Sequence, residues 1–121
     1  MHGSQLSIYT SSKEPAKTNQ WQRNIIDDTL DQGHALATGD FMSTGDDQIV
    51  AGWRGTRRTG KVGIKFYYPS NKDRSKWESI VVDDNQMATE DIRVSDLNND
   101  GKLDIIAAGR ASHNLKIYFN E

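Results

Sequence analysis

The sequence predicts an all-β fold made of repeated four-stranded antiparallel sheets, and three observations lead to this prediction. The chain matches itself without a gap when residues 21–54 are laid on residues 77–110, so that Trp21 falls on Trp77. Each repeat reads as short β-branched or aromatic segments separated by turn-forming residues. No segment has the period of an amphipathic helix. Tandem repeats of this length are typical of folds in which each unit covers the apolar face of the next.

Each repeat divides into four predicted strands, which we letter A to D in the order they would take within one sheet. Strand B is apolar on both faces, as in Ile105-Ile106-Ala107-Ala108, which is typical of a strand covered on both sides. Strand D starts with a tryptophan, and Leu6-Ser7-Ile8-Tyr9 is read as a third copy of strand C. The expected ranges are 34–40 and 90–96 for strand A, 48–54 and 104–110 for strand B, 63–68 and 114–119 for strand C, and 21–27 and 77–83 for strand D.

Several four-stranded units arranged around an axis form a β-propeller, so we interpret each unit as a blade. The chain then holds about two blades in one domain, 1–121: strands C and D in 1–28, a full blade in 29–84, and a blade without its outer strand in 85–121. Propellers typically close with about four to eight blades. Two explanations stay open. The chain is a fragment of a longer propeller, or copies assemble head to tail as a homo-oligomer, with strand D of one copy completing the A-B-C unit of its neighbour.

The composition narrows the classes of function. The chain has 121 residues, with 15 Lys and Arg against 17 Asp and Glu, and no cysteine. The absence of cysteine excludes disulfides and thiolate metal sites, and the balanced charge predicts neither a nucleic-acid nor a membrane partner. The first residues lack the basic and apolar regions of a signal peptide, and no apolar run is long enough to cross a membrane. The compartment stays open.

A nine-residue loop between strands A and B carries the pattern of a calcium site. Oxygen-bearing side chains stand at its first, third, fifth and ninth positions, with Gly101 at the sixth. Ca²⁺ takes about six to eight oxygen ligands, and alternate residues of a tight loop can converge on one ion. An EF-hand is excluded because its twelfth position would be Ala107. The alternative is an ion-free turn rich in Asp, Asn and Gly. The predicted ligands of a structural Ca²⁺ are Asp96, Asn98, Asp100 and Asp104.

The first copy of this loop, residues 40–48, lacks most of the pattern. It keeps Asp40 and Gly45, but its third, fifth and ninth positions are Met42, Thr44 and Gln48. We therefore expect no tight metal site there.

The opposite ends of the two A-B hairpins predict a polar rim. A hairpin centred on Thr44 would place His34 opposite Arg54, and the second hairpin would place Glu90 opposite Arg110. Acid-base residues beside arginines suit a polar substrate such as a sugar. The alternative is an ordinary cross-strand ion pair beside a hydrogen-bonded histidine. The rim residues are His34, Arg54, Glu90, Asp91, Arg110 and His113.

The segment 96–109, Asp-Leu-Asn-Asn-Asp-Gly-Lys-Leu-Asp-Ile-Ile-Ala-Ala-Gly, resembles the FG-GAP/VCBS repeats of integrin-type propellers. More narrowly, segments 33–36, 49–54 and 109–118 resemble the propeller of aldos-2-ulose dehydratase-like proteins. This resemblance implies a longer parent, often extracellular or periplasmic, with a companion cupin-type domain that this chain lacks. It also implies a carbohydrate ligand and a sugar-lyase activity whose candidate catalytic residues are His34, Arg54, Arg110 and His113.

Two functions from different classes follow. The first is a non-enzymatic propeller module, stabilised by Ca²⁺, that binds partners or assembles with itself. The second is a sugar lyase or isomerase that works at the rim. Because no catalytic triad is visible and function depends on sites rather than folds, the first is preferred.

Overall fold

The computed structural model describes residues 3–11 and 21–121, and over these residues it contains nine β-strands and no helix. In the described part of the chain there is accordingly no helix long and apolar enough to span a membrane. The strands are β1 (Leu6–Ser11), β2 (Trp21–Asp27), β3 (Gly33–Gly39), β4 (Gln48–Trp53), β5 (Gly63–Pro69), β6 (Trp77–Asp84), β7 (Thr89–Ser95), β8 (Asp104–Gly109) and β9 (Asn114–Tyr118).

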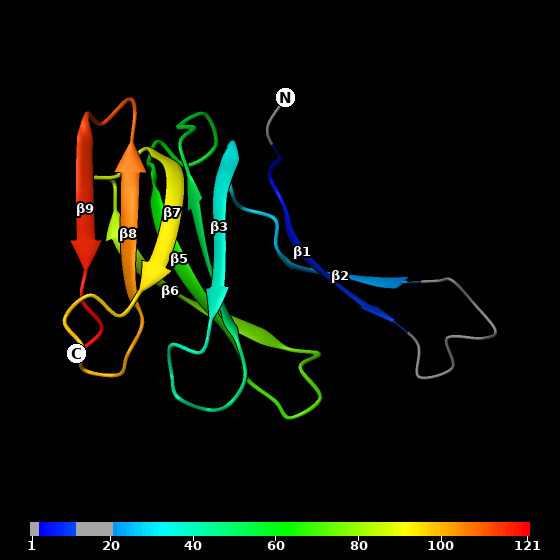
Figure 1. Ribbon diagram of the computed structural model, residues 1–121. Coiled ribbons are helices and arrows are strands. Elements are labelled where there is room, and N and C mark those ends of the chain that lie inside the picture. The colour runs from blue at the N-terminus through cyan, green and yellow to red at the C-terminus, as the bar shows by residue number, and fades with distance from the viewer. Residues whose placement is uncertain (1–2, 12–20) are drawn as a thin grey trace.

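The strands form three antiparallel sheets that follow one another along the chain (Figure 1). The first is the hairpin β1-β2, the second has the order β3-β4-β5-β6, and the third has the order β7-β8-β9. The predicted all-β, antiparallel class is confirmed, and every predicted strand lies within a residue or two of an observed one. The second sheet has the expected strand order A to D. The third has strands A to C only.

The sequence repeat is also a structural repeat. Ile49 of β4 pairs with Tyr67 of β5, and Ile105 of β8 pairs with Tyr118 of β9 in the same register. A break in register at the start of β1 recurs at the equivalent point of β5. The strands that begin with Trp21 and Trp77 therefore have the same place and pairing in their sheets, as the repeat predicts.

The predicted pairing at the far end of each A-B hairpin is wrong. Thr38 pairs with Ile49, one residue away from the expected register, because the loop is centred between residues rather than on Thr44. The register also breaks between Gly33 and Ala35, so His34 is the extra residue of a bulge and does not face Arg54. In the second hairpin the break falls between Thr89 and Asp91. There Glu90 is the extra residue and does not face Arg110.

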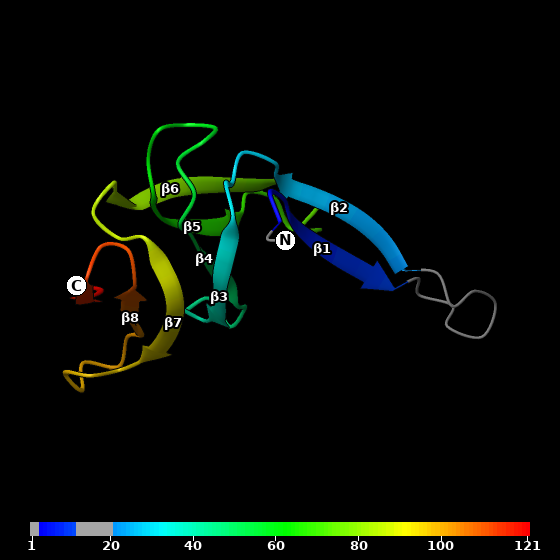
Figure 2. The same ribbon diagram turned by 90° about the horizontal axis from the view of Figure 1, so that it is seen from above.

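Two apolar cores lie between successive sheets, which follow one another in chain order (Figure 2). The core between the second and third sheets holds buried Ala35, Phe41, Val50, Ile64, Met87, Ile92, Ile105 and Ala107. The core between the β1-β2 hairpin and the second sheet holds Leu6, Leu30, Ile49, Ala51, Trp53 and Tyr67. Strand B is apolar on both faces because β4 contributes to both cores.

Candidate metal loop and polar rim

The predicted metal loop joins β7 to β8 and is held by its own side chains. The Asp96 carboxylate accepts hydrogen bonds from the backbone N–H of Asp100 at 3.1 Å and of Gly101 at 2.8 Å. Asn99 and Gly101 have positive φ angles of 59° and 86°, which turn the chain back on itself. The first loop position therefore organises the turn.

The remaining predicted ligands make local contacts. Asp100 accepts a bond from the backbone N–H of Lys102 at 2.9 Å and another from the Asn98 amide at 3.0 Å, and these two bonds lower the pKa of Asp100. Within residues 3–11 and 21–121, no three His, Cys, Asp or Glu side chains are gathered as a metal site requires. The donor set suits a hard cation, whereas the oxygens are arranged around backbone N–H groups. The Ca²⁺ site thus stays a prediction.

Asp104, at the ninth loop position, is fully buried. One carboxylate oxygen accepts the backbone N–H of Leu97 at 2.9 Å, and the other accepts that of Asn120 at 3.0 Å. No Lys, Arg or His of the described segments forms an ion pair with it. Burying a carboxylate is costly unless a positive group lies close by. A cation in the loop would supply that missing charge.

The degenerate loop adopts the same conformation without the acidic set. Asp40 accepts the backbone N–H groups of Thr44 and Gly45, both at 2.8 Å, and these bonds lower its pKa. Gln48 takes the buried ninth position and is 1% exposed. The turn therefore forms without acids at positions three, five and nine. In this loop position three lacks a side-chain oxygen, position five carries only the Thr44 hydroxyl, and the buried carboxylate is replaced by a neutral amide.

The rim is only partly assembled as predicted. Glu90 accepts a charged hydrogen bond from Arg54, and its other carboxylate oxygen lies 3.4 Å from His34 Nε2. His34 Nδ1 lies 2.8 Å from the backbone carbonyl oxygen of Glu90. The bond from Arg54 is the main reason that the pKa of Glu90 is lowered. The ion pair thus joins the second sheet to the third, instead of joining two strands of one hairpin.

Asp91 and Arg110, two further rim residues, also make contacts within their own sheet. Asp91 pairs with Arg93 at 2.8 Å on the exposed face of β7. Arg110 adds a favourable charge near Glu90, and its carbonyl accepts the backbone N–H of His113 at 3.2 Å in the β8-β9 turn. Both ring nitrogens of His34 are directed at Glu90, which favours a structural role for this histidine.

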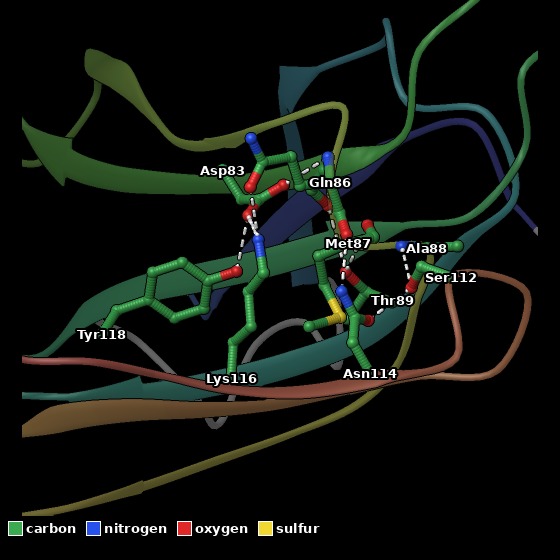
Figure 3. A network of polar contacts seen from close by, with 10 residues as sticks. Asp83, Gln86, Met87, Ala88, Thr89, Ser112, Asn114, Lys116 and Tyr118 are labelled. Atoms are coloured by element: carbon green, nitrogen blue, oxygen red, sulfur yellow. Dashed lines mark hydrogen bonds and ion pairs between the residues drawn. The ribbon is translucent and has the colours of Figure 1, made fainter.

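A buried network that the sequence analysis missed joins the second and third sheets (Figure 3). Asp83, at the end of β6, accepts hydrogen bonds from the Tyr118 hydroxyl at 2.7 Å and from Lys116 Nζ at 3.1 Å. Its second oxygen accepts the backbone N–H of Gln86 at 2.8 Å. Burial would raise the pKa of Asp83, but these bonds outweigh it and the pKa is lowered. Burial and the contact with Asp83 raise the pKa of Tyr118.

The same network occurs one repeat earlier. Asp27, at the end of β2, accepts bonds from Tyr67 at 2.7 Å, from Lys65 at 2.8 Å and from both donors of Thr29. Burial would raise the pKa of Asp27, but the bonds from Lys65, Thr29 and Tyr67 bring it down to about 2. The signal was present in the sequence, as an aspartate 56 residues before Asp83 and a Lys-x-Tyr pattern in both copies of strand C.

The two networks run in one direction along the chain. In each, an aspartate at the end of strand D holds a lysine and a tyrosine of strand C in the following sheet. Tyr9 of β1 has the same position in strand C as Tyr67 and Tyr118, but it does not lie in the core. It is 56% exposed, because in the described residues no sheet covers the outer face of β1.

Comparison with known proteins gives no relative. No protein-family model matches the chain, and neither the curated proteins nor the solved structures contain a match. Over residues 3–11 and 21–121, the structure defines a class: an all-β protein with nine strands in three antiparallel sheets.

Proposed function

We propose that the chain is a calcium-stabilised β-propeller repeat module that serves as a binding or structural scaffold. In this proposal the second sheet is one complete blade, and the third is a blade that lacks its outer strand. The repeated register and the two equivalent Asp-Lys-Tyr networks support it, because they make each sheet cover the next in the same way. Blades of a propeller require such a constant relation.

The buried Asp104 is the observation that carries the calcium part of the proposal. Asp96, Asn98, Asp100 and Asp104 would hold the ion, which neutralises three carboxylates and clamps β7 to β8. A small side-chain adjustment is compatible with the existing bonds, because a carboxylate oxygen that accepts one N–H keeps a second lone pair. The neutral Gln48 in the degenerate loop, where we expect no tight metal site, fits the same reasoning.

Thermal unfolding with and without calcium tests this proposal. At a calcium concentration of about 100 times the dissociation constant, binding adds about 2.7 kcal/mol of stability. For a domain of this size that corresponds to a rise in Tm of about 10 °C. Asp100→Ala should abolish the sensitivity of the Tm to a chelator. Asp47→Ala, which removes an exposed acid of the degenerate loop, should leave it intact. A wild-type Tm that does not respond to chelator refutes the calcium site.

The second candidate function is the sugar lyase that the resemblance implies. The convergence of His34, Arg54 and Glu90 on one rim is the observation that favours it. A general base needs a nitrogen directed at its substrate, and both nitrogens of His34 are directed at Glu90, so we rank this function second. Turnover of a ketosugar that disappears in His34→Ala would reverse the ranking.

A further inference from the structure

Strands β1 and β9 are both copies of strand C. The position of β1, beside β2 and against the second sheet, therefore also suits a strand like β9. Leu6 and Ile8 of β1 pack onto the core that contains Trp53 of the second sheet. The chain carries the same spacing of Leu, Ile and Tyr again in β9, where Leu115 and Ile117 are 69% and 48% exposed. The third sheet therefore presents an apolar strand with the chemistry of β1 but with no sheet to cover it among the described residues.

A second mismatch concerns the tryptophan that begins strand D. Trp77 of β6 packs against the core between the first and second sheets. Its counterpart Trp21, at the start of β2, is 63% exposed. Trp21 thus has the same place in its own sheet as Trp77, but among the described residues no preceding sheet covers it.

An apolar groove lies where such a tryptophan is missing. It has a volume of about 390 Å³ and opens between the second sheet and β9. Around Trp77 the core contains Ile26, Ile49 and Tyr67, and the counterparts of these residues line the groove. Its principal lining residues are Phe66, Ile80, Val82, Ile105, Tyr118 and Phe119.

The pairing of the strand edges points to the same vacant position as the groove. In the second sheet, β5 pairs with β4 on one edge and with β6 on the other. In the third sheet, β9 pairs with β8 only, and the described residues place no strand on its other edge. The groove and the open edge together form a site for one strand of the β2 or β6 type.

We propose that a second copy of this chain fills the site. Its β2 pairs with β9 of the first copy instead of with its own β1, and its Trp21 enters the groove. In return, Leu115 and Ile117 of the first copy take the place of Leu6 and Ile8 on the second copy. The exchange gives a head-to-tail contact that can continue from copy to copy and close into a ring. It rests on the blade assignment of the proposed function and adds the identity of the partner.

The choice of a second copy follows from complementarity within one chain. A strand from another protein could pair with the edge of β9, but this chain already carries the strand that fits. Strand β2 ends in an aspartate, begins with an exposed tryptophan and is the repeat counterpart of β6. In a single copy, β1 is paired with the edge of β2 to which β9 of another copy would bind. The two strands therefore compete for the same edge.

Paired cysteines test the exchange directly, because the chain has no cysteine of its own. In the second sheet Tyr68 lies opposite Glu78, so the repeat places Phe119 opposite Gln22 of the neighbouring copy. Within one copy Gln22 lies opposite Thr10. Opposite residues of antiparallel strands are close enough for a disulfide. Oxidation of the Gln22→Cys/Phe119→Cys variant should therefore give covalent oligomers. The matched Gln22→Cys/Thr10→Cys variant, once oxidised, should hold β2 on its own β1 and so stay monomeric.

The mass of the unmodified chain is the second measurement. Light scattering should show a mass above one chain that rises with concentration. Leu115→Gln should weaken this association by about tenfold or more. Val81→Gln, which changes an exposed aliphatic residue of β6 outside the exchanged strands, should not. A monomer at every concentration, or only reduced thiols in the Gln22/Phe119 variant, overturns the inference. The chelator experiment on the Tm is independent of both results, so it tests the metal module separately.

Discussion

Replacing Asp27 by asparagine tests the inter-sheet network at the carboxylate that accepts its hydrogen bonds. The Asp27 side chain is 6% exposed and Lys65 is 20% exposed, with 2.8 Å between the carboxylate oxygen and Nζ. Asparagine keeps the size of the side chain and can still accept a bond from Tyr67. It removes the negative charge, and the Lys65 ammonium is left half-buried without its partner. The expected result is a loss of stability at neutral pH.

The pKa of Asp27 sets the size of the effect. The pKa falls from an ordinary 3.8 to about 2, and each unit corresponds to about 1.4 kcal/mol, so the folded state gains about 2 kcal/mol from ionised Asp27. Because the pKa is lowered on folding, this stability is complete above about pH 4. It is lost as the pH falls from about 4 towards 2. The Asp27→Asn variant should lack this part of the acid sensitivity.

Urea unfolding at pH 7 and at pH 2.5 measures both consequences. At pH 7 the unfolding midpoint of Asp27→Asn should be about 1 M lower than that of the wild type, for a slope of about 2 kcal/mol/M. At pH 2.5 the two midpoints should approach each other. Asp28→Asn, which changes the exposed neighbouring carboxylate, should behave as the wild type. If Asp27→Asn and the wild type lose the same stability between pH 4 and pH 2, the assignment of the low pKa to this network is wrong.

Two further substitutions test the contacts between the second and third sheets. Gly52→Ala would place a Cβ atom 2.4 Å from Thr89 Cγ2, so it should cost about 1–3 kcal/mol in urea unfolding, whereas Gly3→Ala, which meets no atom, should be neutral. An unchanged midpoint for Gly52→Ala would mean that the sheets are not packed this closely. Glu90→Gln removes a partly exposed ion pair to Arg54 and should cost less than about 1 kcal/mol, with the difference shrinking in high salt. A salt-independent loss of several kcal/mol would contradict this view of the rim.

The sequence predicted the strands well because their signal is local. Apolar residues on both faces marked β4 and β8, and tryptophan marked the start of β2 and β6. The hairpin register was wrong by one residue, because the centre of a nine-residue loop depends on which residues adopt positive φ. Ser43 and Gly45 adopt a positive φ here, and a serine does not by itself indicate a positive φ. A hairpin centred on Thr44 is therefore wrong by one position.

The candidate site divides in the same way. The hydrogen bonds of Asp96 and Asp40 follow from loop spacing, and both loops have them. The pairing of Glu90 with Arg54 depends on two bulges and on how two sheets stack, neither of which a local pattern contains. The Asp27 network joins residues 38 and 40 positions apart. In the sequence the network is marked only by two repeats taken together: an aspartate that recurs after 56 residues and a Lys-x-Tyr pattern that recurs after 51 residues.

Each of these networks runs from strand D of one sheet to strand C of the following sheet. This direction makes strand D the element best suited to the proposed exchange between copies. Strand β6 pairs with β5 in its own sheet through its backbone, and through Asp83 it holds Lys116 of the next sheet. A strand of this type therefore contacts two successive units at once. In the proposed exchange, β2 of one copy would pair with β9 of another, and Asp27 would keep its contacts to its own second sheet while the backbone of β2 joins the neighbour. One strand would then fix the order of the sheets and stabilise them on both sides of the boundary between chains.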